Sequence, residues 1–356
     1  MKINKTDVIK IKEGALSFYI PNPQKYKLDT SAPVFYNPIG KVSRDITILL
    51  LKALKNKPKS AVDLLAATGI RGLRIIKEAK IKNTYINDAN PIAAAFIRKN
   101  AALNKLKPKI YNLRAHEFLA IRYKLKDKKF DYLDIDPFGT PVPFLDASIK
   151  AIKEKGGVLA VTATDTAVLC GTYPLTCIRR YGAKPLRNYL MHEMGIRILI
   201  KKIQEIGMQY DLALIPIFSH VTAHYMRTYL ISEASIKSAN KILNKHGFFK
   251  TAGPLWLGDL WDESLAERMY SLAVRDETIC NETKKLLQLI KEEAKISTVG
   301  FYDMSEAKLH QMPPLNQVIE KIKEKNYLAA KTHFRPNGIR TNMDENQFKR
   351  MVKLIK

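Results

Sequence analysis

The feature that most constrains the fold is a regular alternation of short apolar runs and helical stretches between residues 60 and 165. Strands separated by helices of about 10 to 15 residues indicate βαβ units and a mostly parallel sheet. In chain order, the expected elements are a strand at 60–68, a helix at 69–79, a strand at 83–90, a helix at 91–106, strands at 109–115 and 130–136, a helix at 144–155 and a strand at 157–165. The sequence therefore predicts an α/β fold.

Two apolar runs later in the chain lie too close together for a crossover helix. DLALIPIFSH (211–220) and YMRTYLIS (225–232) suit an antiparallel pair at the edge of the sheet. Before the alternation begins, residues 1–40 are rich in Pro and Asn and predict an ordered arm without long helices.

After GPLWLGDLWD the pattern becomes helical. Helices are expected at 262–295, 317–331 and 344–356. We therefore expect two domains, a larger one over residues 1–258 that includes the arm and a smaller α-rich one over residues 259–356.

Charge is the clearest guide to the partner. The chain carries 60 Lys and Arg against 34 Asp and Glu, a net charge of +26, which favours contact with phosphates or an anionic membrane surface. Membrane contact is the weaker alternative, because no apolar stretch reaches the roughly 18 residues of a spanning helix and the first residues lack a signal-peptide core.

The cysteines indicate the compartment. Only Cys170, Cys177 and Cys280 occur, with no CxxC pair, which argues against a disulfide framework and a zinc ribbon. We expect a cytoplasmic protein in which these residues are packed as small hydrophobes.

A first candidate site is DLLAATGIRG, residues 63–72. An acidic residue on a strand, here Asp63, followed by small residues and a glycine at a helix start, is typical of nucleotide-cofactor loops, because the backbone can approach the ligand. The glycine pattern is incomplete, with Leu65 and Ala67 at two glycine positions and only Gly69 and Gly72 remaining. Alone, the segment fits a tight strand-to-helix turn equally well.

The next strand strengthens the cofactor interpretation. Asp88 of INDANP follows Gly69 by 19 residues, about the offset at which an acidic side chain accepts hydrogen bonds from ribose hydroxyls. The alternative for Asp88 is an N-cap of the helix that opens at Pro91. Arg44 and Arg71 could pair with a pyrophosphate or with the carboxylate of a methionine moiety, whereas Arg74 is expected on a solvated helix face.

The segment DYLDIDPFG, residues 131–139, places carboxylates and a ring at the end of the fourth strand. An acidic residue, Pro and an aromatic at this position are shared by methyltransferases that modify exocyclic amines of bases. Such an amine is a poor nucleophile, so a fixed acceptor, Asp136, must orient it while the Phe138 ring stacks on the base. Asp134 is expected to support the site through hydrogen bonds and Asp131 to be structural.

Several longer motifs extend this pattern. They are SAPVFYNP, ATGIRGLR, DIDPFGTP, TATDTAVLCGTYP, IRRYGAKP, HEMGIRILI, HYMRTYL, GPLWLG and THFRPNGIRT. Together they resemble the tRNA guanosine-26 N2-dimethyltransferase family from about residue 30 to residue 341. The resemblance implies a Rossmann-like class I methyltransferase fold, S-adenosylmethionine as cofactor, and conversion of guanosine 26 of tRNA to the N2-methyl and then the N2,N2-dimethyl form.

The resemblance also implies roles for individual residues. Asp136 holds and deprotonates the guanine N2, and Phe35 and Phe138 sandwich the base beside Pro137. The implied cofactor contacts are Arg44, Asp63, Gly69, Arg71 and Asp88. Thr164 and Asp165 either shape the site or form a structural cap.

Two departures from the family pattern are visible. Arg114 and Ala115 stand where relatives have an acidic residue and Ala near the adenine; Arg114 cannot accept from the adenine amine, so its role is open, while the backbone of Ala115 can still contribute. The cysteine-rich module that many relatives carry before GPLW is missing, so we expect no zinc or other metal.

The expected partner is tRNA, bound by a monomer. Candidate contacts to its backbone are Arg335, Arg340, Lys349, Arg350 and Lys353, with a solvated surface as the alternative for each. Two other functions stay open: a methyltransferase acting on adenine N6 or guanine N2 of ribosomal RNA or DNA, and a catalytically silent RNA-binding protein that retains the cofactor fold.

Overall fold

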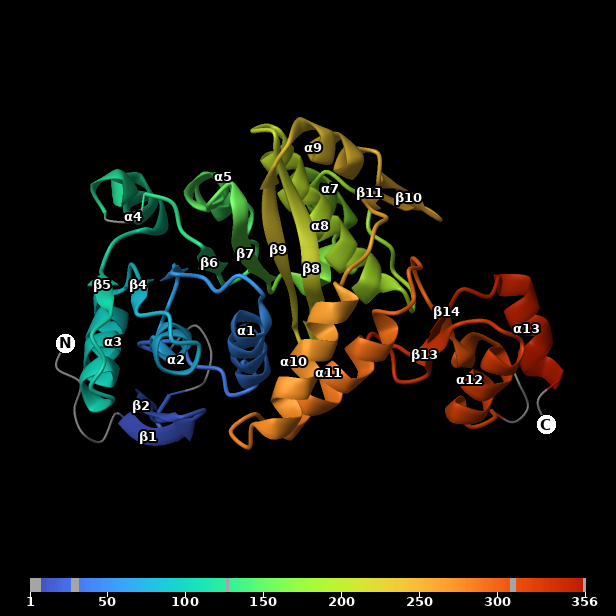
Figure 1. Ribbon diagram of the computed structural model, residues 1–356, viewed down its shortest axis with the longest axis horizontal. Helices are drawn as coiled ribbons and strands as arrows, with labels where there is room; N and C mark the ends of the chain where they lie inside the picture. The colour runs from blue at the N-terminus through green and yellow to red at the C-terminus, as the bar shows by residue number, and fades with distance from the viewer. Residues whose placement is uncertain (1–7, 27–31, 126–127, 308–311, 355–356) are drawn as a thin grey trace.

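The computed structural model describes residues 8–26, 32–125, 128–307 and 312–354. Its centre is a seven-stranded sheet in the order β5-β4-β3-β6-β7-β9-β8 (Figure 1). The strands are β3 (Ser60–Asp63), β4 (Asn83–Asn87), β5 (Lys109–Tyr111), β6 (Tyr132–Ile135), β7 (Lys155–Ala163), β8 (Leu212–Thr222) and β9 (Tyr225–Ala234). β3 to β7 run parallel, and β9 is antiparallel to both β7 and β8. The predicted α/β fold with an antiparallel edge is confirmed.

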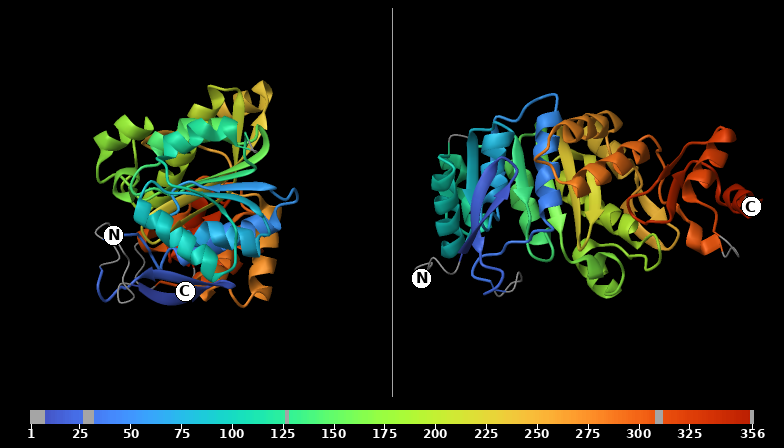
Figure 2. Two further views of the ribbon diagram at one scale, coloured as in Figure 1. Left: turned by 90° about the vertical axis from the view of Figure 1, so that its left-hand side faces the viewer. Right: turned by 90° about the horizontal axis from the view of Figure 1, so that it is seen from below.

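Helices cover both faces of this sheet (Figures 1 and 2). One group of mutually packed helices is α1 (Lys41–Ala53), α2 (Ile70–Glu78), α3 (Pro91–Leu103), α10 (Glu263–Arg275) and α11 (Asn281–Glu293). The other is α4 (Ala115–Ala120), α5 (Val142–Ala151), α6 (Thr166–Leu169), α7 (Pro174–Tyr181) and α8 (Met191–Met208). The sheet is therefore the middle layer of three, as expected where helical crossovers join parallel strands.

The expected boundaries were too long at several strand ends. The strand expected at 60–68 stops at Asp63 and the strand expected at 109–115 stops at Tyr111. Beyond Tyr111, α4 and the 3₁₀ turn η2 (Ile121–Lys124) form a crossover that the sequence did not predict, because a helix of six residues is too short to show a period.

The arm forms a hairpin of β1 (Val8–Glu13) and β2 (Leu16–Pro21) that packs on α2 and α3. Its Glu13 is buried and pairs with Arg44 at 2.7 Å and with Arg74 at 3.0 Å. The expected solvated position for Arg74 is wrong: the side chain is fully buried and also pairs with Asp45 at 2.7 Å. Carboxylates from three separate elements surround it, which the helix period alone could not reveal.

The C-terminal third divides into two parts. α10 and α11, separated at residues 276–280, share the apolar core of the main sheet. The described residues between 302 and 354 build a separate apolar cluster around a three-stranded sheet of β12 (Tyr302–Asp303), β14 (Gly338–Thr341) and β13 (Ala329–Lys331). The helices α12 (Leu315–Glu324) and α13 (Glu345–Leu354) and the 3₁₀ turn η3 (Met304–Ala307) belong to the same part. The expected helix at 317–331 is wrong in its second half, and the domain boundary near 259 stays a prediction.

Arg340 connects these two parts. It is fully buried and donates to Glu193 of α8 at 2.7 Å and to Glu293 of α11 at 3.1 Å. Its expected contact with a tRNA phosphate is therefore wrong, because carboxylates distant in sequence already neutralise it. Arg335 pairs with Asp303 at 2.8 Å, while Lys349, Arg350 and Lys353 are exposed on α13.

Two elements remain. The helix α9 (Ile236–Leu243) packs on β8 and β9, and the hairpin of β10 (His246–Phe249) and β11 (Ala252–Trp256) packs on α8 through β11. Across the described ranges, no helix combines the length and apolar character that crossing a bilayer requires.

Candidate active site

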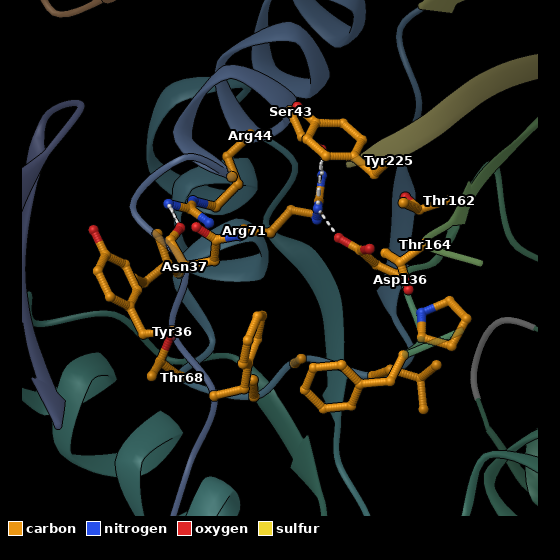
Figure 3. A pocket seen from close by; sticks show the side chains of 18 of the residues that line it. Tyr36, Asn37, Ser43, Arg44, Thr68, Arg71, Asp136, Thr162, Thr164 and Tyr225 are labelled. Atoms are coloured by element: carbon orange, nitrogen blue, oxygen red, sulfur yellow. Dashed lines mark hydrogen bonds and ion pairs between the residues drawn. The ribbon is translucent and has the colours of Figure 1, made fainter. Parts of the chain in front are cut away.

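A cavity of about 740 Å³ opens where β3, β4, β6 and β7 end (Figure 3). Parallel strands place their carboxyl ends at one edge, where α/β folds bind ligands. The lining residues include Phe35, Tyr36, Arg44, Asp63, Ala67, Arg71, Asp88, Asp136, Pro137, Phe138, Thr164, His224 and Tyr225. The sequence thus predicted most of the acidic and aromatic side chains that meet here.

The loop after β3 packs closely against α3 at Gly69. Gly69 caps α2 with φ +76°, and a Cβ there would come within 2.9 Å of Ile97. Ala67 also has a positive φ, +48°, and its amide donates to the Asp88 carboxylate at 2.7 Å. Glycine geometry and Asp88 therefore fix the shape of this loop, while the approach of its backbone to a cofactor stays a prediction.

Asp88 does not cap α3, so the alternative role considered for it is wrong. The cap is Asn90, whose side chain accepts from the Ile92 amide at 2.9 Å. Asp88 instead accepts from the Ala67 and Asn90 amides while lining the cavity. Burial raises the pKa of its carboxyl group, and the two amides oppose that rise.

Asp63, the last residue of β3, is buried beneath the loop and also lines the cavity. One carboxylate oxygen accepts from the Gly72 amide at 2.9 Å. Burial, with the neighbouring carboxylates of Asp134 and Asp136, raises its pKa to about 7 against the opposing effect of Arg71. A carboxyl group that titrates near neutrality is poised to respond to a charged ligand.

Arg71 joins the loop to the end of β6. Its guanidinium donates to the Asp136 carboxylate (Figure 3), and its Nη1 also donates to Thr47 Oγ1 at 2.8 Å. Its Nε lies 3.6 Å from Asp134 Oδ2, so one guanidinium contacts two carboxylates of the DYLDIDPFG segment. Asp136 is thus fixed in direction while its side chain remains 31% exposed.

Behind Asp136, Asp134 is fully buried and pairs with Arg227 of β9 at 2.5 Å. The Tyr132 hydroxyl donates to the same carboxylate. Burial raises the pKa of Asp134, but Arg227 and Arg71 outweigh that effect and keep the pKa below its usual range. Asp131 lies at the other end of β6, away from the cavity. Its carboxylate pairs with Lys153, with 2.6 Å between Oδ1 and Nζ.

Pro137 and Phe138 follow Asp136 in the turn, and Phe138 is 58% exposed at the cavity. The Phe138 ring meets Phe35 edge to face, with centroids 4.6 Å apart and an interplanar angle of 79°. Two rings that sandwich a base must present parallel faces on opposite sides of it. The sandwich therefore stays a prediction, and it requires these rings to separate.

Comparison with known proteins identifies the family. The model of the N2,N2-dimethylguanosine tRNA methyltransferases matches residues 14–252 and 246–353. The chain belongs to this family.

The chain matches relatives of similar length in this family. The tRNA (guanine(26)-N(2)/guanine(27)-N(2))-dimethyltransferase of Aquifex aeolicus is 38% identical over 97% of this chain and 96% of its own. The tRNA (guanine(26)-N(2))-dimethyltransferase of Methanocaldococcus jannaschii is 36% identical over 93% of this chain and 95% of its own. Among solved structures, Trm1 from Pyrococcus horikoshii in complex with S-adenosyl-L-methionine superposes with a TM-score of 0.87 at 31% identity, covering 97% of this chain and all of that one.

Three of the expected cofactor residues do not line the cavity as free contacts. Arg44 lines the cavity, but its charge is already paired with Glu13 at 2.7 Å. Arg114 and Ala115 form the start of α4 and are absent from the cavity lining of the described ranges. Their contact with the adenine stays a prediction.

Among the contributors to the site that sequence reasoning missed are Arg227 and Tyr225. Arg227 lies within an apolar strand motif, HYMRTYL, where a charged residue among buried ones was the available signal. Tyr225 of the same motif lines the cavity, and its hydroxyl is buried without a hydrogen-bond partner in the described part of the chain. No group of three His, Cys, Asp or Glu residues suited to a metal occurs among the residues that the structure describes.

Proposed function

We propose that this chain is an S-adenosylmethionine-dependent tRNA methyltransferase that converts guanosine 26 to the N2-methyl and then the N2,N2-dimethyl form. The observation that carries the proposal is Asp136, directed by Arg71 at the mouth of the cavity and followed by the exposed Phe138 ring. The relatives named for this reaction cover nearly the whole chain, which supports the same chemistry here.

The residues present fit the cofactor. Ala66 and Ala67 of the loop line the cavity, and their small side chains would leave room for a ligand beside the backbone. Asp88 would accept from the ribose hydroxyls, and Asp63 would face a positively charged group of the cofactor. When bound, S-adenosylmethionine supplies an electrophilic methyl group on a sulfonium.

The target amine needs an acceptor, since its lone pair is delocalised into the guanine ring. Asp136 would accept the hydrogen bond of N2, orient the amine, and take its proton as the N–C bond forms and the bond from the methyl group to the sulfonium sulfur breaks, leaving a neutral thioether. Arg71 holds the receiving carboxylate in place. After the first transfer N2 still carries one hydrogen, so the same carboxylate can serve a second transfer.

The partner of this reaction is tRNA, for which the net charge of +26 provides long-range attraction. Lys349, Arg350 and Lys353 on α13 are exposed candidates for phosphate contacts. The affinity for tRNA should fall steeply with salt concentration. The monomeric state and the cytoplasmic location belong to this proposal as well.

A second candidate is dimethylation of both guanosines 26 and 27. It is favoured by one observation, the name of the Aquifex aeolicus relative, which is 38% identical and specifies both positions. The relative from Methanocaldococcus jannaschii, at 36% identity, is named for guanosine 26 alone. Because the two identities are so similar, the choice between one and two target guanosines is made by experiment.

Mass analysis of nucleosides from an unmodified tRNA transcript tests both. Three transcripts are compared: one with guanosines at 26 and 27, one with guanosine 26 replaced by adenosine, and one with guanosine 27 replaced. Loss of dimethylguanosine only when guanosine 26 is replaced supports the main proposal. Partial loss of dimethylguanosine with either replacement supports dimethylation of both guanosines. Methyladenosine would indicate an N6-adenine enzyme, and no S-adenosylmethionine binding in calorimetry would indicate a silent RNA-binding protein.

A further inference from the structure

The helix α7 exposes apolar side chains that a short helix usually turns inward. Leu175 is 74% exposed, Ile178 is 45% exposed, and Tyr173, directly before the helix, is 57% exposed. Cys177 and Tyr181 of the same helix are buried and hold it against the protein. The outward apolar face is therefore available to a partner.

The same surface is strongly basic. Arg179, Arg180, Lys184 and Arg187 are exposed, and no Asp or Glu occurs between Thr166 and His192. We call Tyr173, Leu175, Ile178, Arg179 and Arg180 the α7 surface. An apolar and aromatic surface that carries several cations, of which Arg180 is paired with Asp165, is complementary to a nucleic acid strand, which offers phosphates and base faces.

Hydrogen bonds connect this surface with the turn that follows Asp136. The hydroxyl groups of Thr140 and Tyr181 lie 2.9 Å apart, and Tyr181 donates to Asp165 at 2.7 Å. Arg180 also donates to Asp165, at 3.3 Å. The carboxyl end of α7 is thereby fixed beside the residues that present Phe138 to the cavity.

Thr164 adds a second link on the same side. Its hydroxyl accepts from the Gly139 amide at 2.6 Å, and its own amide donates to the Gly139 carbonyl at 2.9 Å. Thr164 and Asp165, expected either to shape the site or to cap, thus join the strand β7 to the turn and to α7. Thr164 lines the cavity and the next residue, Asp165, is bonded to α7, so α7 is linked to the cavity wall. A strand of RNA whose target base enters the cavity must pass over neighbouring surface.

We propose that the α7 surface binds the tRNA strand next to the target guanosine. Arg179 and Arg180 would contact phosphates, and the Tyr173 ring would stack on an adjacent base. A nucleotide taken out of its stack exposes a face of each neighbouring base, and exposed rings with Arg are the groups that hold such bases. This inference rests on the proposed function and adds the location of the flanking contact.

The test compares Arg179→Ala and Tyr173→Ala with Arg98→Ala, an exposed arginine on α3 near the opposite edge of the sheet. Arg179 is chosen because it bonds only locally, to Thr176, and leaves the Arg180–Asp165 pair intact. With unmodified tRNA, both α7 variants should raise KM about 10-fold and leave the KM for S-adenosylmethionine unchanged. Arg179→Ala should also lower the slope of log K against log salt by about 1, whereas Tyr173→Ala should not.

Tyr173→Phe keeps the ring and should restore normal KM. A wild-type protein that forms no dimethylguanosine would overturn the proposed function itself. An active wild-type protein whose α7 variants bind tRNA as Arg98→Ala does would overturn only this inference, and it would point to a protein partner for the α7 surface.

Discussion

The rings of Phe35 and Phe138 meet edge to face, with their centroids 4.6 Å apart. Such a contact contributes roughly 0.5 to 1.5 kcal/mol beyond burial, and it occupies the space a stacked base would need. The predicted sandwich would therefore replace this ring contact by stacking on the guanine.

Replacing Phe138 by Ala should reduce kcat/KM for tRNA by about 10- to 100-fold, because one stacking partner of the base is lost. Binding of S-adenosylmethionine, measured by calorimetry, should remain close to wild type. Phe138→Tyr keeps the ring and is the control. Equal loss in both variants would argue against stacking as the role of this residue.

The Asp136→Asn substitution should lower the methylation rate by at least about 100-fold, since the amide keeps the shape of the carboxylate but cannot accept a proton. Single-turnover assays with tRNA measure the rate, and calorimetry checks that the cofactor still binds. A rate near that of wild type would exclude Asp136 as the amine acceptor.

Asp63 should make cofactor binding depend on pH. Its pKa of about 7 means that the carboxyl group is partly protonated near neutrality in the free protein. A cationic ligand favours the ionised form, so affinity for S-adenosylmethionine should rise from pH 6 to pH 8 with release of protons. Calorimetry in buffers of different ionisation enthalpy measures that release, which Asp63→Asn should reduce. Equal release by the variant would contradict this assignment.

The Arg227→Met variant should unfold more easily because it leaves the Asp134 carboxylate buried with weaker pairing. We expect a loss of about 3 to 5 kcal/mol in the free energy of unfolding at pH 7. Without Arg227, burial should raise the pKa of Asp134, so folding requires proton uptake and the deficit should shrink as pH falls toward 4.

Denaturant unfolding at the two pH values measures the difference. Arg227→Met combined with Asp134→Asn removes the buried charge and should recover part of the stability at pH 7. A deficit independent of pH in the single variant would mean that lost packing, not the unpaired charge, causes it.

Glu293, which pairs with His333 and Arg340 of the C-terminal part, should make the free energy of unfolding sensitive to acid. Burial raises its pKa, but His333 and Arg340 outweigh that effect and hold the pKa at about 2. Because this value lies below that of the unfolded chain, the carboxylate contributes stability above about pH 4.5 that is lost as pH falls toward 2. The contribution at pH 7 is about 3 kcal/mol from the linkage relation.

Glu293→Gln should therefore unfold more easily at pH 7, and its deficit should narrow by pH 3. The neighbouring Glu292, whose side chain is 46% exposed, provides the matched control, and Glu292→Gln should change the free energy of unfolding by less than about 1 kcal/mol. A similar loss in both variants would contradict the specific role of the buried pair.

The sequence by itself determined the sheet and the place of the site. The alternation between residues 60 and 165 specified parallel strands, because each apolar run and each helix must bury one face against the next. Parallel strands end at a common edge, so Asp63, Asp88 and Asp136 could be assigned to one cavity from their positions after strands. Gly69 was predictable for the same local reason, a helix start with close packing.

Only the tertiary structure decided which charges meet. From the sequence, Arg74 and Arg340 were interpreted as solvated cations. In the structure both are buried and pair with carboxylates from other elements. The pairing of Arg71 with Asp136, and of Arg227 with Asp134, joins residues 65 and 93 positions apart. Periodicity reports which way a side chain faces within its own element, whereas an ion pair depends on where a distant element is packed, and that is fixed only when the whole chain folds.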